Sequence, residues 1–158
     1  MYRRKSLAPF VSSPKPVVRK MLEVSNLQPG ETLIDLGSGD GRIPIMAAEE
    51  FGARGIGIDI NEKFIQEATG LAKALGLCEK VTFLHNDIFE VDLSIADVIT
   101  IYLTTSSNEK LRPKLEQELK PGTRVVTHDF SMRKWNFGKS IRFKEGYRSH
   151  TIYVYLWS

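Results

Sequence analysis

The chain has 158 residues, of which 42% are apolar and 26% charged, and its formal net charge is +3. This length fits one domain with a core of its own, and the composition is that of a soluble globular protein. The sequence has no run near the ~20 apolar residues of a membrane span and no secretory signal, and its single cysteine, Cys78, excludes an internal disulfide or a multi-cysteine metal site. We therefore expect a cytoplasmic monomer with no membrane segment and no metal ion.

Residues 1–15 are rich in proline and serine and predict a non-helical arm, followed by a single domain at 16–158. Apolar residues at near-helical spacing predict a helix from Pro16 to Asn26. Beyond it, helical patterns occupy 41–52, 61–76 and 106–122, and short apolar runs that predict strands occupy 32–37, 53–60, 80–87, 95–103 and 123–130. Two further β-like runs within 139–158 have no helix between them and predict a terminal hairpin.

Local signals at the helix ends agree with this assignment. Pro44 falls in the first turn of its helix, where a missing N–H does little harm, and Asn61 is expected to cap the next helix. Pro113 must either kink the last helix or mark its true start. Apolar strands that alternate with helices predict an α/β fold, a parallel sheet covered on both faces that finishes with an antiparallel pair.

The stretch "DLGSGDG", residues 35–41, follows the first predicted strand and precedes a helix. Ligands of open parallel sheets bind at this kind of position, and Gly37 and Gly39 allow a close approach of the backbone. A P-loop would end in Gly-Lys-Ser/Thr, which is absent here, and a dinucleotide fingerprint would have its third glycine where Arg42 stands. Glycine spacing alone therefore favours neither a phosphate nor a dinucleotide.

Acidic residues at successive strand ends indicate the charge of the ligand. Asp35 and Asp40 flank the loop, and Asp59 and Asp87 end the second and third strands. An acidic residue at the position of Asp59 commonly binds the ribose of an adenosine, whereas a pyrophosphate would be repelled by the neighbouring carboxylates. A ligand with an amino group and a sulfonium, S-adenosylmethionine, fits better. The alternative is that these aspartates only cap helices.

Over residues 17–130 the sequence resembles the class I S-adenosylmethionine-dependent methyltransferases. "LIDLGSGDGRI" resembles their first motif, "GIGIDI" their second, and "LHNDIF" the segment that meets the adenine. The resemblance implies a minimal Rossmann-like methyltransferase fold with a mostly parallel seven-stranded sheet and a C-terminal antiparallel hairpin. It also implies three groups of cofactor-binding residues: Asp35, Gly37, Ser38, Gly39, Asp40 and Gly41 around the methionine part, Asp59 and Ile60 at the ribose and adenine, and Asn86, Asp87 and Ile88 at the adenine ring.

The arm "APFVSSPKPVVRKML" resembles the small archaeal protein lysine methyltransferases and their mitochondrial relatives that modify an ATP synthase subunit, although Ser12 stands where proline is usual. The resemblance implies protein substrates with accessible lysines. The expected catalytic residue is Tyr102, after the fourth strand. The expected substrate-binding residues are Phe10, Val11, Ser13, Pro14, Leu103, Thr104 and Asp129, the last as a residue that steers an ammonium group. A loose tail is the alternative for the arm.

Lysine methylation requires alignment of the amine and loss of its proton, and apolar or aromatic walls such as Phe10, Tyr102 and Trp135 favour the neutral amine without a dedicated base. His85 and His128 are interpreted as structural histidines. A methyltransferase acting on RNA or a small molecule is the second hypothesis, and a non-catalytic Rossmann-like binding module is the third. Basic runs at 2–5, 132–135 and 138–144 leave nucleic acid open as a partner, but no further domain recognises it.

Overall fold

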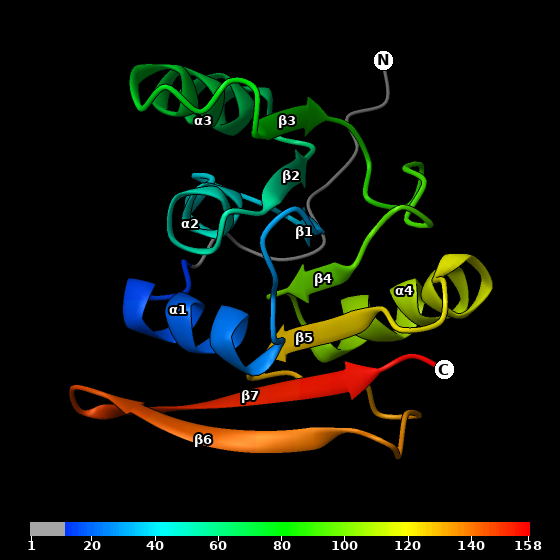
Figure 1. The fold of residues 1–158 in the computed structure, drawn as a ribbon. Helices are drawn as coiled ribbons and strands as arrows, with labels where there is room; N and C mark the ends of the chain where they lie inside the picture. Colours follow the sequence, from blue (N-terminus) through cyan, green and yellow to red (C-terminus); the bar gives the residue numbers. More distant parts are fainter. Residues whose placement is uncertain (1–11) are drawn as a thin grey trace.

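The computed structural model describes residues 12–158, which form a seven-stranded sheet in the order β3-β2-β1-β4-β5-β7-β6 (Figure 1). Strands β1 to β5 are parallel, and β7 lies antiparallel between β5 and β6. The predicted α/β architecture with its terminal hairpin is confirmed. The strands are β1 (Thr32–Leu36), β2 (Arg54–Asp59), β3 (Val81–His85), β4 (Val98–Ile101), β5 (Arg124–His128), β6 (Lys139–Glu145) and β7 (Arg148–Leu156).

The helices are α1 (Lys15–Val24), α2 (Arg42–Phe51), α3 (Glu62–Ala74) and α4 (Thr105–Glu118). Helices α1, α2 and α3 lie on one side of the sheet and α4 on the other (Figure 1). Asn61 caps α3, as predicted, because its side chain accepts a hydrogen bond from the Phe64 amide. Pro113 lies inside α4, which begins after the cap residue Thr104, so Pro113 does not mark the start of this helix.

Two apolar layers hold the sheet between its helices. Leu33 packs with α1 and α2, whereas its neighbours Ile34 and Leu36 pack with α4. The hairpin continues this alternation, since Tyr155 belongs to the α4 layer and Ile152 to the opposite one. Strands buried on both faces require apolar residues at successive positions, which explains their continuous apolar runs in the sequence.

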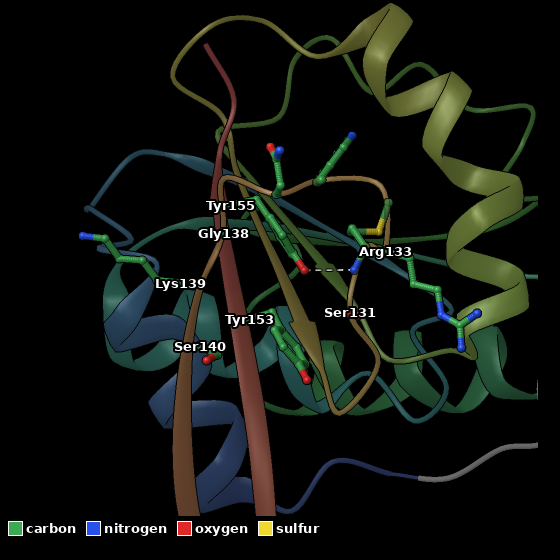
Figure 2. Close-up of a pocket in the computed structure, with 10 residues that line it drawn as sticks. Ser131, Arg133, Gly138, Lys139, Ser140, Tyr153 and Tyr155 are labelled. Atoms are coloured by element: carbon green, nitrogen blue, oxygen red, sulfur yellow. Dashed lines mark hydrogen bonds between the residues drawn. The ribbon is translucent and has the colours of Figure 1, made fainter.

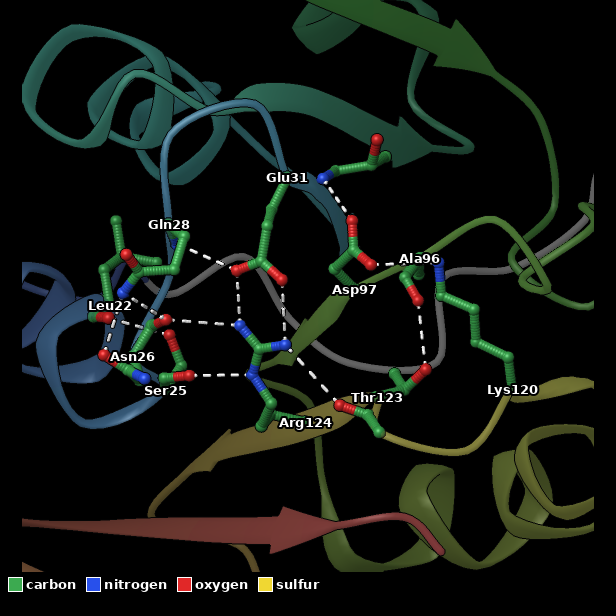
Figure 3. Close-up of polar contacts among 12 residues, drawn as sticks. Leu22, Ser25, Asn26, Gln28, Glu31, Ala96, Asp97, Lys120, Thr123 and Arg124 are labelled. Atoms are coloured by element: carbon green, nitrogen blue, oxygen red, sulfur yellow. Dashed lines mark hydrogen bonds and ion pairs between the residues drawn. The ribbon is translucent and has the colours of Figure 1, made fainter.

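Ion pairs and backbone contacts stabilise the amino-terminal edge of the sheet (Figure 3). The Arg124 guanidinium donates to Glu31 Oε2 at 3.0 Å and to the Ser25 carbonyl at 2.9 Å, so it joins β5 to the end of α1 and the start of β1. Its hydrogen bonds hold the pKa of Glu31 below the ordinary value. Asp97 accepts from the Thr32 amide at 2.8 Å and pairs with Lys120 at 2.9 Å. This edge is therefore rigid, and it is opposite the strand ends at which ligands bind.

Two features of the surface follow from the same structure. Among residues 12–158, no helix is long and apolar enough to cross a membrane. Cys78 is exposed in the turn before β3.

Candidate active site

The glycine loop joins β1 to α2 and is attached to the end of β2. Gly37, Gly39 and Gly41 all have left-handed backbones, with φ of 84°, 54° and 86°. The Gly37 and Ser38 amides donate to the Ile58 carbonyl at 2.8 and 2.9 Å. A Cβ at Gly41 would lie only 2.6 Å from the Phe83 ring, so a side chain there would force the loop away from the sheet. The predicted need for glycine thus has both a conformational and a packing cause.

A small cavity opens beside this loop. It is lined by Ser12, Ser13, Asp35, Gly37, Ser38, Asp40, Arg42, Ile43 and Tyr102. The Ser38 hydroxyl is buried and has no hydrogen-bond partner among the residues that the structure describes. Asp35 accepts a hydrogen bond from the Thr100 hydroxyl at 2.9 Å, and burial raises its pKa to about 8. An unpaired hydroxyl and a poorly solvated carboxyl are what a site for a polar, cationic ligand would contain.

The other two aspartates near the loop already have partners. The Asp59 carboxylate accepts from the Gly39 amide and from the Asn61 amide, both at 2.9 Å, so it holds the backbone of the loop, whereas the cap of α3 is Asn61 itself. Asp40 forms an ion pair with Arg42 at 2.6 Å. Arg42 in turn donates to the Ser13 carbonyl at 3.0 Å. The glycine loop is therefore linked directly to the arm.

The predicted adenine-side residues gather at the ends of β2 and β3. The backbone amide of Asn86 donates to the backbone carbonyl of Asp59 at 3.1 Å, and His85 Nε2 lies 3.0 Å from the Ile60 carbonyl. Ile88 is buried, and Asp87 accepts from the Phe89 amide. The cofactor residues expected from the sequence thus lie along one edge of three neighbouring strands, and their individual roles remain predictions.

Tyr102 lies where the glycine loop, the arm and β5 meet. Its ring stacks on His128 with centroids 4.0 Å apart, and Phe130 lies further along the same stack at 6.3 Å. Ser13 Oγ lies 2.8 Å from His128 Nδ1. Leu103 packs against Gly37, where a Cβ would come within 3.1 Å of its side chain. The structure therefore brings Ser13, Tyr102 and Leu103 to the glycine loop.

Three other predicted substrate residues have local structural roles. Thr104 caps α4 by accepting from the Ser107 amide, and Pro14 occupies the cap position of α1. The Asp129 carboxylate accepts from the Thr151 amide at 3.0 Å and from Arg148 at 3.2 Å, so it is largely occupied by the hairpin. The predicted Phe10 and Val11 lie outside the described residues.

Two site residues were not predicted from the sequence as site residues. Arg42 was noted only as a residue that does not fit a dinucleotide fingerprint, and no local signal indicates its contact with the arm. His150 lies on β7 and is completely buried against His128. Only the strand register, which places His128 opposite Ile152, brings these two histidines together.

His128, Asp129 and His150 form a cluster whose ligand atoms lie within 4.8 Å of one another. His128 Nε2 and His150 Nδ1 are 2.7 Å apart, and Asp129 Oδ2 is 3.6 Å from the former. Two imidazoles on a tetrahedral zinc ion, each bonded at ~2.0–2.1 Å, would hold their nitrogens about 3.3 Å apart. The separation is therefore that of a hydrogen bond. Burial lowers the pKa of His128 to about 4, although the Asp129 charge opposes the shift.

A second cavity lies between the loop after β5 and the hairpin (Figure 2). Two of the residues that line it are hydrogen-bonded to each other: the Tyr155 hydroxyl accepts from the Met132 amide at 2.9 Å. Figure 2 shows the side chains of Arg133 and Lys139 extending in opposite directions. Their charges do not converge on one ligand.

Comparisons with known proteins agree with this geometry. Residues 35–139 match the ANTKMT methyltransferase domain family. A protein-lysine N-methyltransferase of Saccharolobus islandicus is 44% identical over 94% of this chain and 92% of its own length. The adenine nucleotide translocase lysine N-methyltransferase of Mus musculus is 32% identical over 80% of this chain, which spans 55% of that protein. The crystal structure of an RNA methyltransferase from Salinibacter ruber with S-adenosyl-L-homocysteine has a TM-score of 0.87 and 46% identity, covering 92% of this chain and 93% of that one.

Proposed function

Because this chain belongs to the ANTKMT methyltransferase domain family, we propose that it transfers the methyl group of S-adenosylmethionine to the side-chain amine of lysines in proteins. The observation that carries the proposal is the 44% identity to the Saccharolobus islandicus protein-lysine N-methyltransferase over nearly the whole of both chains. Two related mouse proteins are also lysine methyltransferases, one of adenine nucleotide translocase and the other of an ATP synthase subunit.

The residues around the glycine loop fit S-adenosylmethionine. The Ser38 hydroxyl, buried and without a hydrogen-bond partner among residues 12–158, and the carboxyl of Asp35 border the cavity where the methionine part would lie. Asp59 ends β2, a position at which an acidic residue commonly binds the ribose hydroxyls of an adenosine. When bound, the cofactor supplies a methyl group activated by its positive sulfur. Asp35 favours the bound cation once its own carboxyl is ionised.

On the acceptor side, the chain has to align an amine with the methyl group and make it neutral. From the ordinary lysine pKa of ~10.4, forming the neutral amine at pH 7 costs roughly 4–5 kcal/mol. The Tyr102 ring, which is stacked on the buried His128, and the Leu103 side chain lie beside the loop, and such a wall lowers this cost by desolvation. Orientation by such a wall supplies much of the rate of a direct displacement.

An RNA acceptor is the second candidate, because the Salinibacter ruber protein of 46% identity is an RNA methyltransferase. The two functions differ in where the methyl group goes. We expect a cell extract incubated with methyl-labelled S-adenosylmethionine and this protein to carry label that protease removes, nuclease leaves, and hydrolysis releases as methyl-lysine. Label removed by nuclease would overturn the proposal in favour of RNA.

Gly37→Val provides the inactive control for this experiment. The left-handed backbone of Gly37 and its approach to Leu103 leave no room for a branched side chain. The variant should show no transfer above background and no binding of S-adenosylmethionine, which identifies the label in the wild-type sample as the product of this site.

A further inference from the structure

Three buried polar side chains form a hydrogen-bonded chain between the arm and the hairpin. Ser13 Oγ lies 2.8 Å from His128 Nδ1, and His128 Nε2 lies 2.7 Å from His150 Nδ1. Ser13 is 4% exposed and both histidines are 0% exposed. The chain ends at His150 Nε2, which is buried without a hydrogen-bond partner among residues 12–158. Buried polar groups of this kind are costly, and an unpaired one calls for a functional explanation.

One end of this chain opens to the reaction site. Ser13 lines the cavity beside the glycine loop together with Tyr102, whose ring stacks on His128. Asp129 lies beside the link between the two histidines, since its Oδ2 is 3.6 Å from His128 Nε2 and 4.0 Å from His150 Nδ1. A hydroxyl thus lies at the outer end of the chain, and a negative group lies beside its inner link.

We propose that Ser13, His128 and His150 are a proton relay that removes the proton which the acceptor amine must lose before methyl transfer. The inference rests on the proposed lysine acceptor. Ser13 Oγ takes a proton from the lysine ammonium as its own proton passes to His128 Nδ1, and the Nε2 proton of His128 passes to His150 Nδ1. The neutral amine then attacks the methyl carbon, the carbon–sulfur bond breaks, and S-adenosylhomocysteine keeps the electron pair. After product release the relay reverses, and water accepts the proton at Ser13.

Burial and the surrounding charges set the protonation state of the relay. Burial lowers the pKa of His128 to about 4, so its imidazole is neutral at pH 7 and one ring nitrogen is free to accept a hydrogen bond from the Ser13 hydroxyl. The same shift makes His128 a weak base, so in the relay it holds no extra proton and passes one on to His150. The Asp129 carboxylate lies within 4.0 Å of both rings and favours positive charge at His128, whereas Arg148, paired with Asp129 at 3.2 Å, opposes it. The Tyr102 ring covers His128 on the cavity side and excludes water from it.

The first test needs no acceptor. Nitrogen-15 NMR of the histidine rings in the full chain distinguishes the two neutral tautomers of His128. We expect a proton on Nε2 and none on Nδ1, since only this tautomer accepts from Ser13 and donates to His150. A proton on Nδ1 would send the relay in the wrong direction and overturn the proposal, whatever the acceptor is.

The second test is the pH profile of single-turnover transfer to nuclease-treated extract protein. Ser13→Ala should lower the rate about 100-fold at pH 7, a typical loss for a missing general base. The difference should shrink to about threefold near pH 10, where roughly a quarter to a third of the amine is neutral without help. Ser13→Thr, which keeps the hydroxyl, should recover most of the loss at pH 7. Ser140→Ala, on the exposed part of β6, is the matched control.

A loss that is the same at every pH would mean that Ser13 only positions the arm, and no loss at all would remove it from the reaction; either result overturns the relay. His150→Gln should reproduce the pH-dependent loss with unchanged affinity for S-adenosylmethionine, while its melting temperature reports on folding. If the wild-type protein labels no protein at any pH, the proposed function fails. The tautomer of His128 then still decides whether the relay exists.

Discussion

At the scale of single residues, two aspartates near the same loop have opposite environments. Asp35 is 3% exposed and accepts one hydrogen bond, from Thr100, whereas the part-buried Asp59 accepts hydrogen bonds from two backbone amides. Their sequence contexts, each at the end of an apolar strand, look alike. Burial and hydrogen-bond partners therefore distinguish the two carboxyls, and we expect the first to favour a cation and the second to bind hydroxyl groups.

Replacing Asp59 tests whether it binds ribose or only caps the loop. We expect Asp59→Ala to weaken the binding of S-adenosylmethionine at least about tenfold, because a charge-assisted contact to the ribose contributes on the order of 1.5–3 kcal/mol. Calorimetry measures this affinity. Asp92→Ala is the matched control, since Asp92 also accepts a backbone amide but lies in an exposed loop away from the site. Unchanged affinity in a folded Asp59→Ala protein would leave Asp59 as a capping residue.

At the scale of elements, the helices and strands were predictable because their signals are local. Asn61 caps α3, and Pro44 lies in the first turn of α2, as the sequence indicated. The contact of Ser13 with His128 joins positions 115 apart, and that of His128 with His150 joins positions 22 apart. Such contacts depend on strand register and on the path of the arm, which no periodicity encodes, so the relay could not be found from the sequence.

The arm is the element whose role can be separated from the relay. Deletion of residues 1–11 removes the predicted Phe10 and Val11 but keeps Ser13, with its contacts to Arg42 and His128. We expect transfer to protein acceptors to fall at least about tenfold through a higher KM, because the apolar residues predicted to contact the acceptor lysine are lost. Cofactor affinity and melting temperature should change little. Normal transfer by the shortened chain would show that these residues do not contribute to acceptor binding.

At the scale of the whole molecule, the two edges of the sheet differ in what they contribute. At the amino-terminal edge, polar side chains have hydrogen-bond partners: the Arg124 guanidinium, for example, donates to Glu31 and to the Ser25 carbonyl. The carboxyl-terminal edge contains groups that lower stability in the free protein: the buried Asp35 carboxyl, and the Ser38 hydroxyl and His150 nitrogen, neither of which has a partner among residues 12–158. Stability of the fold and chemistry of the site are thus located at opposite ends of the same strands.

This arrangement predicts a characteristic pH dependence of stability. The Asp35 pKa rises from 3.8 unfolded to about 8 folded, so the folded protein binds the extra proton, and stability from this group is lost as pH rises toward 8. The His128 pKa falls from 6.5 to about 4 on folding, so this group makes stability rise with pH between 4 and 6.5. Over that range it opposes the effect of Asp35. Above pH 6.5 only the Asp35 effect remains. The free energy of unfolding of the cofactor-free protein should therefore fall by on the order of 1.5 kcal/mol between pH 6.5 and 8.

Asp35→Asn separates this effect from the rest of the chain, because an amide also accepts the Thr100 hydrogen bond but does not ionise. Denaturant unfolding of the variant should show no fall between pH 6.5 and 8, and the variant should be more stable than the wild type at pH 8. Its affinity for S-adenosylmethionine should be lower, since the bound cation favours an ionised Asp35, and for the same reason wild-type affinity should rise with pH toward 8. If neither the stability nor the cofactor affinity of the wild-type protein changed between pH 6.5 and 8, Asp35 would already be ionised in the folded state. The burial of Asp35 would then make no pH-dependent contribution to binding the cationic ligand.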